Sequence, residues 1–221
     1  MSDAKELAAK IRLQIKELEQ KILAHPYLTA VEEGRIPFDQ LQLFVGQQFH
    51  IISSDLRSIS LLVSRYGNSP SRSFLLNVLH GEVAALEALH TFAAELKLSS
   101  ADLEAVEPIP AAHAYCAYMA WLALYGSDAE LAGALLVNFP AWGANCRRMR
   151  LALRHKYNLA ESALTFLALF ADMPPFEAEA LSVIQSGLDR GVSARSIHRA
   201  ARMLQAYELM YWDALADAAG K

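Results

Sequence analysis

The apolar residues of this chain recur every three or four positions over most of its length, a spacing that is typical of amphipathic helices. No segment shows the alternation of apolar and polar residues, bounded by turn residues, that predicts a β-strand. Alanine, leucine and glutamate dominate between the prolines and glycines, and these three residue types favour helix. The sequence therefore predicts an all-α protein.

Proline, glycine and asparagine divide the chain into predicted helices of different length. The segment 39–66 is apolar around most of its circumference, so we expect it at the centre of the fold. We find no internal repeat and no low-complexity linker, so residues 1–221 are predicted to form a single domain. Helices of this length suit an antiparallel bundle. The predicted helices are 3–24, a short helix ending at Gly34, 39–66, 71–97, a short helix from Ser100, 110–125, 128–137, 140–157, 161–171, 175–190 and 193–218.

Composition excludes several classes of protein. Hydrophobic residues make up 54% of the 221 residues and charged residues 20%, which allows a large core. The net charge of −4 argues against a nucleic-acid partner. No apolar run reaches the roughly 18 residues that a membrane-spanning helix needs. Two cysteines provide neither a disulfide framework nor a zinc site, and the charged N-terminus is unlike a signal peptide, so we expect a cytoplasmic protein.

A glutamate interrupts the apolar stripe of the last predicted helix. The stripe has alternating steps of four and three, which place its members on one face. Burying an unpaired carboxylate is costly, so such a group normally becomes protonated or finds partners. Glu208 is therefore predicted to be either paired for structural reasons or held for chemistry. The stripe consists of Ile197, Ala201, Leu204, Glu208, Tyr211 and Leu215.

Polar residues also share one face of the segment 71–97, where His80, Glu87 and His90 follow the same spacing. The pair Glu87-x-x-His90 has the spacing that carboxylate-bridged di-iron bundles use, but these bundles need a second such pair, which this chain lacks. Three interpretations remain open for Glu87 and His90: a hydrogen bond within the structure, a contact with a ligand, or a metal site.

Two further helices carry candidate site residues. In the segment 39–66, Gln48 and Asp55 share a face that could look into a cavity. The helix after Pro110 carries Tyr115 and Tyr118, at a spacing that is more typical of a core. A tyrosine that is buried there needs a partner for its hydroxyl group.

Several stretches resemble the TenA/PqqC family. His25-Pro-Tyr-Leu-Thr-Ala-Val-Glu-Glu-Gly-Arg-Ile-Pro37 and Leu43-Phe-Val-Gly-Gln-Gln-Phe-His50 are similar to the opening of this group. Tyr207-Glu208-Leu-Met-Tyr211-Trp212 resembles the end of TenA proteins, where the glutamate is catalytic, and Leu86–His90 resembles a Glu/His segment of the group. The resemblance implies a haem-oxygenase-like helical bundle. The group includes TenA-type thiaminase II, pyrroloquinoline-quinone synthase and CADD-like di-iron oxidases.

The resemblance also implies a site. We expect Glu208 to act as general acid and base, with Tyr211 tuning it, on a small heterocyclic ligand linked to thiamine metabolism. TenA-like proteins often assemble, and the high apolar content fits a homodimer or larger homo-oligomer. The expected ligand-binding residues are Gln48, His50, Glu87, His90, Tyr115, Tyr118 and Trp142.

The chain departs from the family in three places, one of which is Gln48, where TenA proteins have an aspartate after a glutamine. Phe139-Pro140-Ala141-Trp142-Gly143 is the best match to the TenA motif Pro-Cys-x-Trp, and Ala141 stands where the nucleophilic cysteine belongs, so ordinary thiaminase II activity is not expected. The His-x-x-x-Asp-x-x-His element of the CADD-like oxidases is also missing. The alternatives to an enzyme are a non-catalytic binding protein and an iron oxygenase with an incomplete ligand set. No cofactor is expected, although iron bound by Glu87 and His90 stays open.

Overall fold

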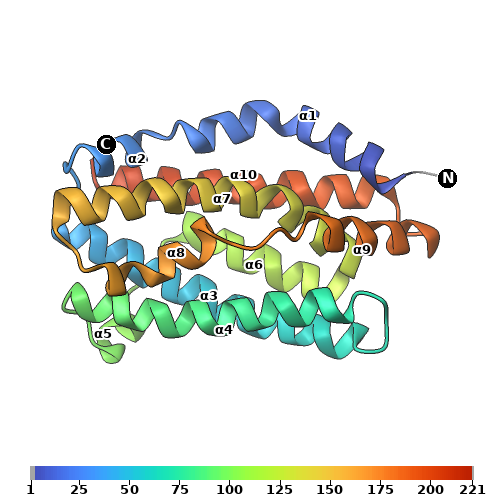
Figure 1. Ribbon diagram of the computed structural model, residues 1–221, viewed down its shortest axis with the longest axis horizontal. Helices are drawn as coiled ribbons and strands as arrows, with labels where there is room; N and C mark the ends of the chain where they lie inside the picture. The colour runs from blue at the N-terminus through green and yellow to red at the C-terminus, as the bar shows by residue number, and fades with distance from the viewer. Residues whose placement is uncertain (1–2, 221) are drawn as a thin grey trace.

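Helices make up most of the chain that the computed structural model describes, residues 3–220, and no strand occurs in this range (Figure 1). The all-α prediction is confirmed, and most predicted helices begin and end within two residues of the observed ones. The helices are α1 Ala4–Leu23, α2 Pro26–Glu32, α3 Phe38–Tyr66, α4 Arg72–Glu95, α5 Ser100–Ala105, α6 Pro110–Tyr125, α7 Asp128–Tyr157, α8 Thr165–Ala171, α9 Glu177–Asp189 and α10 Ala194–Ala218, with a 3-10 helix at Glu161–Leu164.

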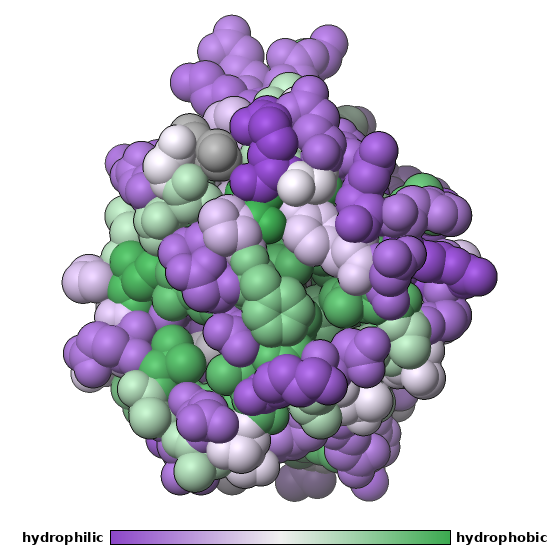
Figure 2. Space-filling view, turned by 90° about the vertical axis from the view of Figure 1, so that its left-hand side faces the viewer, coloured by the Kyte–Doolittle hydropathy of each residue, from purple (hydrophilic) through white to green (hydrophobic). Residues whose placement is uncertain are grey.

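Five long helices form the bundle that positions the site. Helix α7 packs against α10, α3 packs against α4 and α6, and α6 closes the bundle against α10. Helix α1 lies over α10 and α7 along the top of Figure 1, and α8 fills the space between α7 and α4. Seen from the end that carries α2 and α5, hydrophilic side chains surround a hydrophobic middle (Figure 2). No helix within residues 3–220 is both long and apolar enough to cross a membrane.

Local sequence explains where the key helix α7 begins and ends. The Ser127 hydroxyl accepts a hydrogen bond from the Glu130 amide, while the Glu130 carboxylate accepts one from the Ser127 amide at 2.9 Å. The helix ends at Asn158, which adopts the left-handed conformation with φ of 53°. Asparagine tolerates this conformation better than most residues, so it suits the position.

The predicted break between 137 and 140 is wrong, because α7 continues through Pro140. A proline inside a helix removes one backbone hydrogen bond and costs about 3 kcal/mol. Here the ring lies on the exposed side, while every residue from Asp128 to Phe139 is buried. Tertiary packing of this buried segment outweighs the local penalty of the proline.

The apolar face of α10 that the sequence predicts as buried is buried in the structure, whereas Glu87, a polar residue expected at a site on α4, turns outward. All six residues of the α10 stripe are buried, including Glu208. In α4, Leu75 and Leu89 are buried in the core, and His80, Val83 and Glu87 are exposed. Helix α4 lies at the edge of the bundle (Figure 1), so only one side of it is covered. Glu87, which the sequence analysis places at a ligand site, therefore lies on the uncovered side of α4.

Candidate active site

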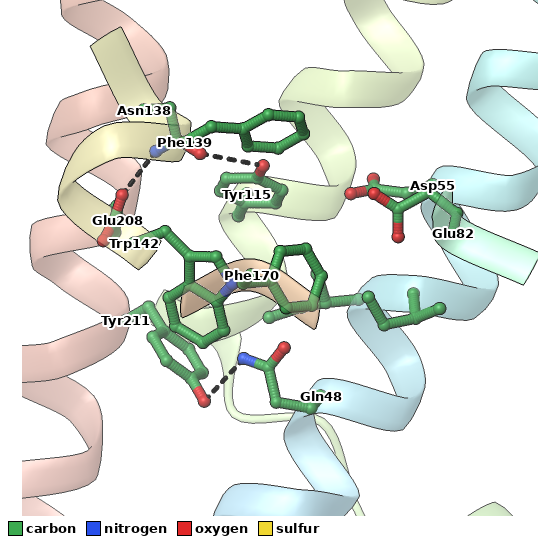
Figure 3. Close-up of a pocket in the computed structure, with 12 residues that line it drawn as sticks. Gln48, Asp55, Glu82, Tyr115, Asn138, Phe139, Trp142, Phe170, Glu208 and Tyr211 are labelled. Carbon is green, nitrogen blue, oxygen red and sulfur yellow. Dashed lines mark hydrogen bonds between the residues drawn. The ribbon is translucent and has the colours of Figure 1, made fainter. Parts of the chain in front are cut away.

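A small cavity of about 40 Å³ lies between the long helices. This volume holds roughly three water molecules. Carboxylates stand at both ends of the cavity, and aromatic side chains form the walls between them (Figure 3). The lining residues are Gln48, Ile51, Ile52 and Asp55 from α3, Glu82 from α4, Tyr115 from α6, Asn138, Phe139 and Trp142 from α7, Phe170 from α8, and Glu208 and Tyr211 from α10.

Glu208 is a buried carboxylate with two side-chain hydrogen-bond donors. The Trp212 indole N–H donates to Glu208 Oε1 at 3.2 Å, and the Asn138 amide donates to Oε2. Burial raises the pKa of Glu208 to about 8, while these two hydrogen bonds act in the opposite direction. The group is therefore mostly protonated at neutral pH, and it is able to change its protonation state near that pH.

Asn138 connects Glu208 to a neighbouring tyrosine, and the sequence reasoning did not select it. Its amide oxygen accepts a hydrogen bond from the Tyr115 hydroxyl at 3.4 Å. Asn138 lies one helical turn before Trp142 on α7, so both side chains point into the cavity (Figure 3). The four-residue spacing of Asn138 and Trp142 predicts a shared face only if one helix contains both residues, and the predicted break at Pro140 separates them.

Tyr211 and Gln48 meet across the cavity. The Gln48 amide donates to the Tyr211 hydroxyl at 2.8 Å, and both side chains are buried. Trp142 packs edge-on against Tyr211, with 6.2 Å between the ring centroids. The structure thus brings together five of the residues that the sequence and the family resemblance selected, namely Gln48, Tyr115, Trp142, Glu208 and Tyr211.

The other four selected residues do not reach this cavity. His50 Nε2 lies 2.6 Å from the Val106 carbonyl oxygen, and the His90 ring packs edge-on against Phe49 at 5.9 Å. Glu87 is exposed on α4. Tyr118 stacks on Trp121, with ring centroids 5.7 Å apart. Helical spacing shows which residues share a face but not which polar residue reaches a cavity, and on α4 it is Glu82 that lines the cavity while Glu87 is exposed.

Asp55 and Glu82 line the end of the cavity that lies away from Glu208 (Figure 3). The face of α3 that carries Asp55 was predicted to look into a cavity, whereas Glu82 was not selected. The sequence does contain a sign that Glu82 is buried. Glu82 lies seven residues after Leu75 and seven before Leu89, and this spacing places its carboxylate on the apolar face of α4.

No cysteine lines the cavity among the described residues. Cys116 and Cys146 are both buried elsewhere, and burial raises the pKa of Cys116 to about 12 and that of Cys146 well above its usual range. Ala141 is also buried outside the cavity lining, and Asn138 is the residue of this segment that contacts Glu208. The site therefore holds no thiolate for nucleophilic attack.

Metal ligands do not gather in the part of the chain that the structure describes. Residues 3–220 contain no group of three or more His, Cys, Asp or Glu side chains placed to hold one ion. Glu87 and His90 in particular are not among the residues that line the cavity.

The helical bundle has the haem-oxygenase-like fold. The chain belongs to the TENA/THI-4/PQQC family, whose sequence profile matches residues 12–218.

Solved structures with the same fold cover nearly the whole chain. A TenA homologue from Pseudomonas syringae pv. tomato superposes with a TM-score of 0.82 at 12% identity, covering 96% of this chain and 93% of that one. The TenA homologue from P. horikoshii OT3 gives a TM-score of 0.74 at 19% identity, covering 95% and 97%. Haem oxygenase-1 from the cyanobacterium Synechocystis gives 0.71 at 15% identity, covering 97% and 96%.

Two curated relatives are aminopyrimidine aminohydrolases. The one from Halalkalibacterium halodurans is 27% identical over 113 residues, which is 51% of this chain and 50% of the relative. The one from Bacillus subtilis is 26% identical over 113 residues, or 51% and 48%. The matched region spans only about half the length of these relatives.

Proposed function

We propose that this protein hydrolyses a C–N bond of a small aminopyrimidine-type heterocycle and releases ammonia, with Glu208 as acid and base. The main support is the buried Glu208 carboxylate, whose pKa lies near 8, at a cavity with aromatic walls. The similarity to two aminopyrimidine aminohydrolases supports the same reaction class. Tyr211, which lies one turn after Glu208 and is held by Gln48, orients the ligand beside the acid.

Glu208 performs two proton transfers in this proposal. The protonated carboxyl group donates its proton to the leaving nitrogen, and the electrons of the broken C–N bond leave with ammonia. Water forms the new C–O bond and returns one proton to the carboxylate, which restores the acid. Water is the nucleophile because no cysteine lines the cavity in residues 3–220.

The neighbours of Glu208 keep the carboxyl group in position. Asn138 and Trp212 hold one oxygen each, so the group does not rotate freely. Trp142, Phe139 and Phe170 provide flat apolar walls for a ring. We assign no role in this reaction to His50, Glu87, His90 or Tyr118.

The ligand enters from a groove beside the cavity. This groove has a volume of about 310 Å³ and shares Glu82, Phe139 and Phe170 with the cavity. The cavity volume of about 40 Å³ is too small for a heterocycle, so the proposal requires the side chains that separate the two spaces to move. Phe170 lies on the short helix α8, which makes it the candidate for this movement.

Ammonia release from a panel of small aminopyrimidines tests the proposal, with an enzyme-coupled ammonium assay. General acid–base catalysis is worth roughly 10²–10⁴-fold, so Glu208→Gln should lower turnover by about that factor. The exposed residue Glu87 provides the matched control, because Glu87→Gln removes a carboxylate outside the cavity. Turnover that is unchanged in Glu208→Gln contradicts the assignment.

The absence of a cavity cysteine also supports a second function, a non-catalytic binder of the same class of ligand. In that case an aminopyrimidine raises the melting temperature of the wild-type protein and is recovered chemically unchanged. Glu208→Gln then changes the affinity for this ligand, and no ammonia is released by either protein.

A further inference from the structure

Asp55 and Glu82 form a pair of buried carboxylates that the proposed reaction leaves without a role. Asp55 comes from α3 and Glu82 from α4, and each side chain is only 4% exposed. In Figure 3 the two carboxylates point toward each other at the end of the cavity away from Glu208. Two like charges held this close in an enclosed site repel each other unless a proton or another cation lies near them.

The pair lacks the partners that a purely structural role requires. Asp55 Oδ1 and Glu82 Oε2 are enclosed and have no hydrogen-bond partner among the described residues. Neither carboxylate takes part in an ion pair with a lysine or arginine within residues 3–220. Buried polar groups are nearly always hydrogen-bonded, and leaving one unpaired costs stability. Unpaired acceptors on the wall of a cavity indicate a place for a donor that comes from outside the chain.

We propose that Asp55 and Glu82 together bind a cationic nitrogen of the ligand, an ammonium or a protonated ring amidine. This proposal rests on the proposed function, because it names the charge and orientation of the substrate of the same site. The ligand ring then lies against the aromatic walls, and the end of the molecule opposite the cation faces Glu208. The Asp55–Glu82 pair thus determines which end of the ligand is presented to the acid.

An organic cation fits this pair better than a metal ion. Divalent metals take four or more ligands, and no third metal-binding side chain joins Asp55 and Glu82 in the described chain. An ammonium group carries up to three N–H donors, which match the unpaired oxygens. The aromatic side chains Tyr115, Trp142 and Phe170 on the same cavity suit a flat ring and also stabilise a nearby cation.

The protonation state of the empty pair supports this assignment. Burial raises the pKa of Glu82 to about 8, and burial together with the facing carboxylate raises the pKa of Asp55 well above its usual range. The titratable groups near the pair are Tyr115 and Cys116 from α6, and Glu208 from α10 lies beyond Tyr115. Burial raises the pKa of Tyr115 and of Cys116, so both side chains are neutral. The empty pair therefore holds a proton at neutral pH. A bound cation lowers the pKa of the pair and displaces that proton.

Calorimetry with two ligands of the same shape tests the inference. Pyrimidin-5-ylmethylamine carries an ammonium group, and pyrimidin-5-ylmethanol is its neutral counterpart. We expect the wild-type protein to bind the amine at least about tenfold more tightly at pH near 8. Titrations in buffers with different ionisation enthalpies should show that up to one proton is released with the amine and none with the alcohol.

Substitutions then locate the preference. Asp55→Asn and Glu82→Gln should each abolish the tighter binding of the amine, and both variants should remain folded, because each removes an unsatisfied buried carboxylate. Glu87→Gln is the control, since Glu87 is exposed on the same helix as Glu82 and lines neither the cavity nor the groove. Three results overturn the inference: the amine and the alcohol bind equally well, neither of them binds, or the preference for the amine survives both substitutions. Tight binding of Mn²⁺ that the same two substitutions abolish overturns it in favour of a metal.

The binding experiment does not depend on turnover. If wild-type protein releases no ammonia but prefers the amine through Asp55 and Glu82, the proposed reaction fails and the cation site stands. If Glu208→Gln lowers turnover as expected but the wild-type protein does not distinguish amine from alcohol, the reaction stands and the cation site fails.

Discussion

The burial of Glu208 makes a quantitative prediction about stability. The pKa of this carboxyl group rises from 4.5 to about 8 on folding, chiefly because the side chain loses contact with water. At about 1.4 kcal/mol for each pKa unit, the difference corresponds to about 5 kcal/mol. Between these two pKa values the unfolded chain is ionised at this group and the folded chain is not.

The sign follows from the number of bound protons. The folded state holds a proton on Glu208 that the unfolded state releases above pH 4.5, so this group favours folding less and less as the pH rises toward about 8. A glutamine at this position does not titrate. The free energy of unfolding of Glu208→Gln, minus that of the wild-type protein, should therefore increase by about 5 kcal/mol between about pH 4.5 and pH 9.

Urea unfolding followed by far-UV circular dichroism at a series of pH values measures this difference. The comparison isolates Glu208, because the other buried acids, including Glu82, titrate in both proteins. Glu87→Gln serves as the control and should show no such trend, since the Glu87 side chain is solvated. A difference between Glu208→Gln and wild type that stays constant over the pH range would refute the reasoning, because it would mean that the folded protein carries Glu208 in its ordinary ionisation state.

Three further predictions concern the surroundings of the cavity. Asn138→Ala removes a hydrogen bond that lowers the pKa of Glu208, so the pKa should rise and the alkaline limb of the kcat/KM–pH profile should move to higher pH. An alkaline limb that does not move shows that Asn138 does not control the pKa of Glu208. A Cβ atom at Gly143 would lie 2.6 Å from the Phe170 carbonyl oxygen, so Gly143→Ala should disturb α8 and destabilise the protein by about 1–3 kcal/mol, as measured by urea unfolding. A Cβ atom at Gly81 would meet no atom within 4 Å, so the control Gly81→Ala should be neutral or stabilising. Trp121, Leu124 and Tyr125 expose apolar surface on α6, so light scattering after size-exclusion chromatography should show at least a dimer, and a monomer contradicts this expectation.

The spacing of apolar residues was enough to predict the helices and the burial of Glu208. Helical periodicity is a local property, since residues three and four apart always share a face, so the α10 stripe could be read without knowing its neighbours. The same reasoning failed at Pro140, because the local cost of a proline is visible in the sequence, whereas the packing that outweighs it involves other helices.

Only the tertiary structure decided which residues form the site. Glu87 and Glu82 lie on the same helix, and the sequence favours Glu87 as a site residue because His90 follows it at the spacing of a metal-binding pair. The structure exposes Glu87 and buries Glu82, because α3 and α8 cover only one side of α4. The meeting of Asn138 with Glu208, and of Gln48 with Tyr211, likewise joins residues that lie 70 and 163 positions apart. Periodicity shows what each helix can bury, but which side chains meet depends on how the helices rotate and pack against one another.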